Sequence, residues 1–316
     1  MKILARTPSR ASLFGGGTDL DSYASAYGGM VLAMAINLRC QTILYTDDDI
    51  WEKTKHDIPY DADPALLYEI LGHFNLSGMH HTRVVSFFDG FISAGLGSSA
   101  SFTVSLIGAI AYYLNRQLSR DEIAQLAWRI EVHNLNWYGG KQDQYTVSHG
   151  GMNIIEFGNK VTITSIKSSY VNKLLPYLLL CYTGGMRHSS SIQKGFSVLS
   201  NNQIKVLHKM KKQVIHASMA LFSGDIETLG MLLDEAWEYK KESNLSVTNR
   251  RIDDIYAHAK KHGALGGKLL GAGGSGYMLF VIAPDKRENL IAKLREKAVE
   301  DVDFGIDLNG LEVRRL

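Results

Sequence analysis

The chain has 316 residues, 45% of them hydrophobic, so it exceeds one ordinary compact domain and can bury two cores. Its 34 Lys and Arg residues nearly balance 32 Asp and Glu residues, which excludes the strongly basic surface of a protein that works on nucleic acid or anionic membrane. No segment approaches about 18 consecutive apolar residues, and the N-terminus lacks the apolar core of a signal peptide. We therefore expect a cytoplasmic protein that handles small molecules.

The first half of the chain predicts strands and helices around two glycine-rich loops, FGGGTDLDSYASAYGG and SAGLGSSAS. A capping-box pattern, Ser119 with Glu122, begins the clearest helix, and Gly139 and Gly140 interrupt the helical sequence that follows. In chain order we expect strands at 2–6 and 31–45, a helix at 64–75, a strand at 81–91, helices at 101–114 and 120–134, and strands within 150–166.

The second half predicts a strand, a long helical region and a last glycine-rich turn, after a soft domain boundary near Gly158. Cys40 and Cys181 stand far apart in apolar surroundings, which favours two buried, reduced thiols over a disulfide or a zinc site. We expect a strand at 174–186, helices within 189–261, a glycine-rich turn feeding a strand within 263–284, a helix at 285–299 and a strand at 302–306.

The segment AGLGSSAS, followed by a long helix, has the composition of an anion site, because glycines let a phosphate approach the exposed N–H groups at a helix start. It is no Walker loop, since no Gly-Lys-Ser/Thr follows the glycines. Gly95, Gly97 and Ala100 match a loose dinucleotide fingerprint, but Asp121 begins a helix where that fold needs an acid ending a strand. The alternative is that the glycines only let a helix pack tightly.

Two other segments could contribute to the same site. Arg10 and Asp19 flank a glycine triplet, so a cation and a carboxylate can converge from the two ends of one loop, although a structural ion pair explains the same pattern. KLLGAGGSGYM is either a tight turn before a strand or a backbone wall against a ligand.

Glu131 and Asp143 are the candidate carboxylates, separated by the Gly139–Gly140 break. Two such groups can divide the work, one holding Mg²⁺ and the other meeting a substrate hydroxyl. Most carboxylates are solvated surface groups, but the apolar neighbours of Glu131 argue against simple exposure.

In order along the chain, RASLFGGGTDL, AGLGSSAS and KLLGAGGSGYM resemble the three motifs of the GHMP kinases. DLDSYASAYGGMVLAMAIN, GGKQDQYTVSHGGMNIIEF and YTGGMRHSSSIQ narrow the resemblance to the D-glycero-D-manno-heptose 7-phosphate kinases, which phosphorylate the anomeric hydroxyl of that sugar. The resemblance implies an α/β (α+β) fold in two parts, 1–158 and 159–316. The first would be a ribosomal-protein-like βαβ domain with a left-handed crossover, and the second a ferredoxin-like domain.

The same resemblance implies ATP and Mg²⁺ as cofactors, a sugar phosphate as substrate, and no nucleic-acid or membrane partner; homo-oligomerisation stays open. Asp143 and Arg10 are the expected catalytic residues, and Ser99 and Glu131 the expected Mg²⁺ ligands. The residues expected to bind ATP are Gly95, Leu96, Gly97, Ser98, Ser99, Ala100, Ser101, Gly271, Gly273 and Gly274. The residues expected to bind the sugar phosphate are Gly16, Gly17, Thr18, Asp19, Lys141 and Arg187. The alternatives are another sugar 1-kinase, of galactokinase or fucokinase type, and a non-catalytic sensor of sugar and ATP.

Overall fold

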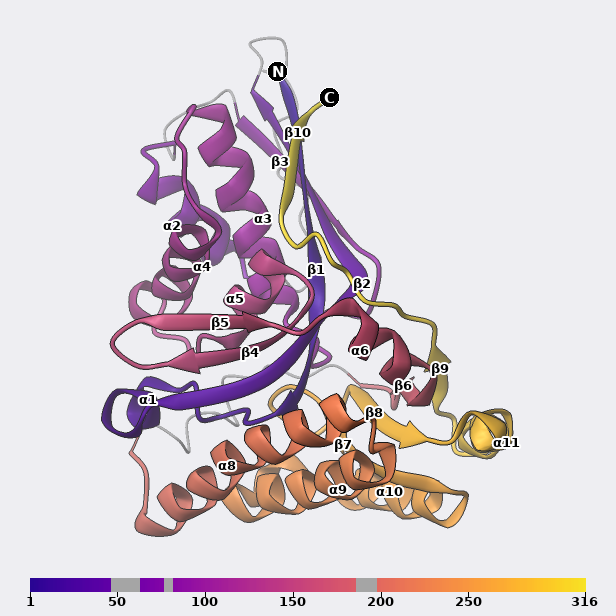
Figure 1. Cartoon of the computed structure of the whole chain (residues 1–316). Helices are drawn as coiled ribbons and strands as arrows, with labels where there is room; N and C mark the ends of the chain where they lie inside the picture. The colour runs from indigo at the N-terminus through magenta and orange to yellow at the C-terminus, as the bar shows by residue number, and fades with distance from the viewer. Residues whose placement is uncertain (47–62, 77–81, 186–197) are drawn as a thin grey trace.

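The computed structural model describes residues 1–46, 63–76, 82–185 and 198–316. Its strands form two sheets, and Figure 1 shows a separate group of helices beside each of them. Every strand pair in the described residues is antiparallel.

The first sheet is built around two long strands, β1 (Lys2–Phe14) and β2 (Gly29–Thr46). β1 pairs along one edge of β2, while β3 and β4 share the other edge, β3 beside residues 40–46 and β4 beside residues 29–34. The order is β10-β1-β2-β4-β5, with β3 attached to β2. The remaining strands are β3 (Thr82–Phe88), β4 (Met152–Phe157), β5 (Val161–Ser165) and β10 (Glu312–Arg315).

Helices from the first half of the chain cover one side of β1 and β2 (Figure 1). The predicted capping box is confirmed: the Ser119 hydroxyl accepts from the Glu122 N–H at 3.2 Å, and Glu122 accepts from the Ser119 N–H at 2.7 Å. The elements are α1 (Asp21–Tyr27), α2 (Pro64–His73), α3 (Ser98–Tyr113), α4 (Arg120–Arg129), the π-helical turn η2 (Ile130–Asn134) and α5 (Gln142–His149).

The second sheet has the order β7-β8-β6-β9. The chain visits it as strand, helices, strand, strand, helix, strand, which confirms the ferredoxin-like arrangement. Its strands are β6 (Leu178–Tyr182), β7 (Ala264–Leu269), β8 (Tyr277–Ile282) and β9 (Glu300–Val302). The helices are α6 (Ser168–Leu174), η3 (Leu175–Tyr177), α8 (Asn201–Ser223), α9 (Ile226–Ser243), η5 (Leu245–Val247), α10 (Arg250–Lys261) and α11 (Pro284–Arg295).

Two predicted strands are shorter than expected. The strand at 174–186 begins only at Leu178, because Pro176 cannot donate to a ladder and lies in a 3₁₀ turn. The strand at 302–306 ends at Val302, and Ile306 makes a single bridge to Ile36 instead.

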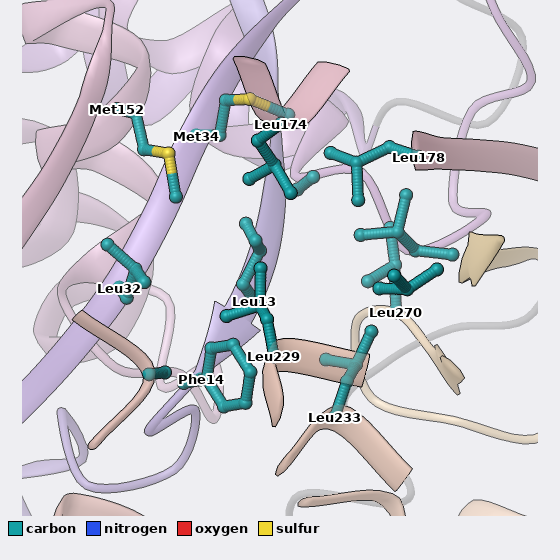
Figure 2. Packing of buried hydrophobic residues seen from close by; sticks show 14 of the residues in the cluster. Leu13, Phe14, Leu32, Met34, Met152, Leu174, Leu178, Leu229, Leu233 and Leu270 are labelled. Atoms are coloured by element: carbon teal, nitrogen blue, oxygen red, sulfur yellow. The ribbon is translucent and has the colours of Figure 1, made fainter. Parts of the chain in front are cut away.

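One hydrophobic core joins the two sheets. Figure 2 shows Leu13 and Leu32 from the first sheet together with Leu229 and Leu233 from α9 and Leu270 after β7, all buried in the same cluster. Because burial of apolar surface holds this junction, a site between the two parts rests on a rigid base.

The predicted boundary near Gly158 does not match the division between the sheets. Gly158 lies in the turn between β4 and β5, both in the first sheet, and β10 returns to that sheet from the far end of the described chain. The handedness of the crossover from β3 to β4 stays a prediction. Cys40 and Cys181 are free and buried, as expected. No helix in the described ranges is long and apolar enough to cross a membrane.

Candidate active site

A cavity of about 570 Å³ lies where the two parts of the molecule meet. Its wall takes residues from β1, the start of α3, α5, α9 and the turn after β7. All three glycine-rich motifs contribute to it, through Gly16 and Gly17, Gly95 and Gly97, and Gly271. The structure therefore brings together segments that the sequence places far apart.

The start of α3 faces this cavity as an uncapped helix terminus. Gly97 is its N-cap, with a left-handed φ of 74° that disfavours other residues, and no side chain caps the first turn. The first N–H groups of α3 thus lack a side-chain partner, which is the arrangement that binds phosphate.

The loop residues predicted to bind ATP fall into two groups. Gly95, Gly97, Ser98 and Ser99 line the cavity. Leu96, Ala100 and Ser101 are buried outside its lining, where the Ser101 hydroxyl donates to Pro8 O at 2.7 Å. Ser101 and Leu96, whose carbonyl accepts from the Arg10 N–H at 3.0 Å, hold the loop against β1.

Arg10 and Asp143 form a two-pronged ion pair on the cavity wall. Arg10 Nε donates to Asp143 Oδ1 and Nη2 donates to Oδ2, both at 2.7 Å. Arg10 Nη1 also donates to Gly95 O, which ties the pair to the loop of residues 93–97 before α3, the predicted phosphate loop. Asp143 also lies close to Gly97 in the same loop: a Cβ added at Gly97 would be 3.2 Å from Asp143 Oδ2. The carboxylate therefore lies where a hydroxyl could meet a phosphate bound at α3.

Glu131 is buried in the π-helical turn η2, which continues α4 without a break. Its carboxyl oxygens lie 2.6 Å from the Thr103 hydroxyl and 2.6 Å from Gln144 Nε2. Burial raises the pKa of Glu131 to about 7, against the lowering effect of these two hydrogen bonds.

The residues present fit one Mg²⁺ ion shared with a nucleotide. Thr103 Oγ1 lies 2.9 Å from Ser99 O as well as beside Glu131, so one side chain links the two expected ligands. Within the described ranges no three His, Cys, Asp or Glu residues gather into a metal cage. Mg²⁺ is commonly bound by one or two carboxylates plus substrate phosphates, so the Glu131 carboxylate and the Ser99 hydroxyl on one cavity wall are compatible with such a site.

The loop Gly15–Asp19 forms another part of the wall and is held by the carboxylate of Asp19. Asp19 accepts from the N–H groups of Gly17 at 2.9 Å and Gln142 at 3.0 Å. Burial raises the pKa of Asp19, and the neighbouring Asp143 adds to this effect. Thr18 is buried and absent from the cavity lining, with its hydroxyl 2.8 Å from Gly15 O.

Gly140→Ala tests whether Asp19 positions the substrate. A methyl group at Gly140 would overlap the Asp19 carboxylate, so that side chain must move. We expect the KM for the phosphate acceptor to rise about 10-fold while the Kd for ATP stays unchanged. Steady-state kinetics and nucleotide titration measure both. Gly158→Ala, in open space on the β4–β5 turn, is the control. An unchanged acceptor KM would remove Asp19 from the acceptor site.

The remaining predicted residues have different surroundings. Gly271 packs against the backbone of Gly95, and Gly273 against Val247, both on the wall. Gly274 is not part of the wall, and its N–H donates to Val247 O at 2.8 Å. Lys141 also lies off the wall, with Nζ 3.1 Å from Asp21 and 4.0 Å from the centre of the Trp128 ring. Arg187 lies outside the described residues.

Comparison with known proteins identifies the family. The models of the GHMP kinases N terminal domain and the GHMP kinases C terminal match residues 68–151 and 217–300. A D-glycero-alpha-D-manno-heptose 7-phosphate kinase from Campylobacter jejuni is 32% identical, over 99% of each chain. The chain belongs to the GHMP kinases.

Solved structures agree with this fold. A putative sugar kinase from Campylobacter jejuni superposes with a TM-score of 0.77 at 30% identity, over 100% of this chain and 98% of that one. A D-glycero-D-manno-heptose 1-phosphate kinase from Bacteriodes thetaiotaomicron, at 24% identity and a TM-score of 0.78, covers 99% of each chain and shares the fold.

Sequence reasoning missed several polar side chains of this GHMP kinase. Thr103 and Gln144 hold Glu131, and Gln142 holds both Asp19 and the Ser12 hydroxyl. Two lysines on the wall, Lys240 and Lys268, were also missed. Glutamine, threonine and lysine are common on surfaces, so only the tertiary contacts distinguish these five residues from solvated ones.

Proposed function

We propose that this GHMP kinase transfers the γ-phosphoryl group of ATP to the anomeric hydroxyl of a heptose 7-phosphate, giving the 1,7-bisphosphate. The observation that carries the proposal is the Arg10–Asp143 pair, which is bound to the phosphate loop through Gly95 and lies in the same cavity as Asp19. GHMP kinases use ATP as phosphate donor. We choose a heptose 7-phosphate as the acceptor because the Campylobacter relative is named for that substrate.

The geometry suits an in-line transfer at the start of α3. The N–H groups of the first turn would hold the triphosphate, and Leu66, Phe88 and Phe102 offer an apolar end of the cavity to the base. The acceptor oxygen forms a bond to the γ-phosphorus. The bond between the γ-phosphorus and the β–γ bridging oxygen breaks, and ADP leaves with that oxygen. Asp143 orients the attacking hydroxyl and receives its proton, while Arg10 fixes the carboxylate.

Ser99 and Glu131 would hold Mg²⁺, which supplies charge neutralisation on the phosphate oxygens. An anomeric hydroxyl is more acidic than an ordinary alcohol, so Asp143 has less proton transfer to perform than with a primary alcohol. Positioning then carries most of the rate, since a loose transition state requires little early deprotonation.

A coupled assay of ATP consumption over a panel of acceptors tests the assignment. We expect kcat/KM for D-glycero-D-manno-heptose 7-phosphate to exceed that for the unphosphorylated heptose, galactose and fucose by about 10-fold or more, because a dianionic group adds charge-assisted hydrogen bonds. An Asp143→Asn preparation controls for contaminating kinases. A higher kcat/KM with galactose or fucose would make the protein a hexose 1-kinase, and binding without turnover of any acceptor would make it a sensor.

A further inference from the structure

Two lysines from the second part of the molecule reach the cavity, and their hydrogen-bond partners are all backbone carbonyls. Lys240 on α9 donates from Nζ to Leu269 O at 2.8 Å and to Gly271 O at 2.6 Å. Lys268 on β7 is buried and donates to Leu13 O at 3.0 Å. Both side chains line the cavity.

Neither lysine has a carboxylate partner in the part of the chain that the structure describes. Asp143, the carboxylate beside Gly97, is already paired through both oxygens with Arg10. The charges that act on Lys240 are those of Lys268 and Arg10, which are both positive. Burial, together with these neighbours, lowers the pKa of Lys240 well below its usual range and that of Lys268 to about 7. In the described residues, no carboxylate therefore neutralises either lysine directly.

The two lysines also have N–H donors that their carbonyl partners do not use. A protonated lysine has three N–H donors, so in that form Lys240 keeps one free after its two carbonyl bonds and Lys268 keeps two. A phosphate group, with several acceptor oxygens, matches such donors.

The position of Lys240 points to the place where the phosphoryl group moves. Its partner Gly271 packs directly against Gly95, and Gly95 O is also the partner of Arg10. Gly95 in the phosphate loop therefore has two neighbours: Gly271, which accepts a hydrogen bond from Lys240, and Arg10, which is paired with Asp143. Lys268 reaches Leu13, just before the loop that carries Asp19.

We propose that Lys240 and Lys268 form a phosphate-binding subsite in the cavity wall, beside the turn after β7 that packs against Gly95. The subsite deepens the proposed kinase function and rests on it. Its occupant is a phosphoryl dianion, either the terminal phosphate of the nucleotide or the phosphate already present on the acceptor. The carbonyl bonds of the free enzyme keep both amine groups in place, and the arriving anion favours their protonated form and accepts from the remaining N–H donors.

The test is ligand binding by Lys240→Met and Lys268→Met, measured by calorimetry without Mg²⁺ so that Glu131 is not involved. The ligands are adenosine, ADP, a non-hydrolysable ATP analogue and heptose 7-phosphate. We expect each substitution to weaken at least one phosphate-bearing ligand about 10-fold while adenosine binds as to wild type. A loss for the ATP analogue but not ADP identifies the γ-phosphate, and a loss for heptose 7-phosphate alone identifies the acceptor phosphate.

Proton uptake separates charge from packing. Repeating the titrations in buffers of different ionisation enthalpy should show that wild type takes up protons when the phosphate binds and that Lys240→Met takes up fewer. Lys240→Arg, which keeps a cation, should recover part of the affinity. Lys241→Met is the matched control, since Lys241 is the next residue on α9, pairs with Glu238 and does not line the cavity.

Wild-type affinity of both methionine variants for the ATP analogue and for heptose 7-phosphate, with unchanged proton uptake, would overturn the subsite and leave Lys240 as a support for the Leu269 and Gly271 carbonyls. The nucleotide titrations do not depend on the acceptor. If the wild-type protein fails to phosphorylate the heptose while the methionine variants lose affinity for the ATP analogue, the proposed substrate is refuted and the subsite stands.

Discussion

Asp143→Asn should lower kcat by about 10²-fold or more, which corresponds to about 2.7 kcal/mol of transition-state stabilisation. The substitution is nearly isosteric but removes the charge that meets the acceptor hydroxyl. We propose the ATP contacts mainly on the N–H groups at the start of α3 rather than on this carboxylate, so ATP binding should survive. Measuring kcat and the Kd for ATP on one preparation tests both statements.

The ion pair adds a second effect that must be separated from catalysis. Arg10 is almost fully buried, so an asparagine leaves an uncompensated guanidinium and should lower the melting temperature. The double variant Arg10→Met/Asp143→Asn removes that cation. We expect it to regain thermal stability while turnover stays low. Recovery of kcat in the double variant, or near-normal kcat per folded molecule in the single one, would show that Asp143 only holds the loop.

Glu131→Gln should weaken the use of Mg²⁺ but stabilise the metal-free protein at high pH. A neutral amide is a poorer ligand for a hard cation, so the Mg²⁺ concentration for half-maximal rate should rise about 10- to 100-fold. An unchanged Mg²⁺ titration would remove Glu131 from the metal site. Glu156→Gln, an exposed carboxylate on β4, is the control.

The stability effect follows from the raised pKa of Glu131. The folded-state pKa is about 7 and the ordinary value is 4.5, so the folded protein keeps this proton over a range where the unfolded chain has lost it. Stability from this group is therefore present below about pH 4.5 and lost as the pH rises through 7, by about 3 kcal/mol in all. Glutamine carries no such dependence. The metal-free variant should melt at a higher temperature than wild type at pH 8, and the gain should shrink as the pH falls and disappear below about pH 4.5.

Local signals predicted much of this fold because they act within a few residues. The pair Ser119 and Glu122 began α4 as expected, and the small residues after Ser98 gave a helix buried on nearly every side. The glycine at position 97 also has a local explanation, because the N-cap of α3 adopts a left-handed backbone conformation that favours glycine. Such features depend on the backbone of one segment.

The features that sequence reasoning missed depend on segments far apart in the chain. Nothing near Lys240 in the sequence WEYKKES distinguishes it from Lys241, yet one lines the cavity and the other pairs with Glu238. The partners of Glu131 come from α3 and α5, which only the folded structure brings together. The π-helical turn that carries Glu131 likewise had no local signal.

The pairing of β10 with β1 has a consequence for folding during synthesis. Ile3 pairs with Arg315, so nearly the whole chain must leave the ribosome before the outer edge of β1 gains this partner. Until then β1 presents an open row of N–H and C=O groups, the kind of edge to which other strands add. The strands and helices between β1 and β10 are synthesised while that edge is open, so incomplete chains carry a site for pairing with other strands that the finished fold covers.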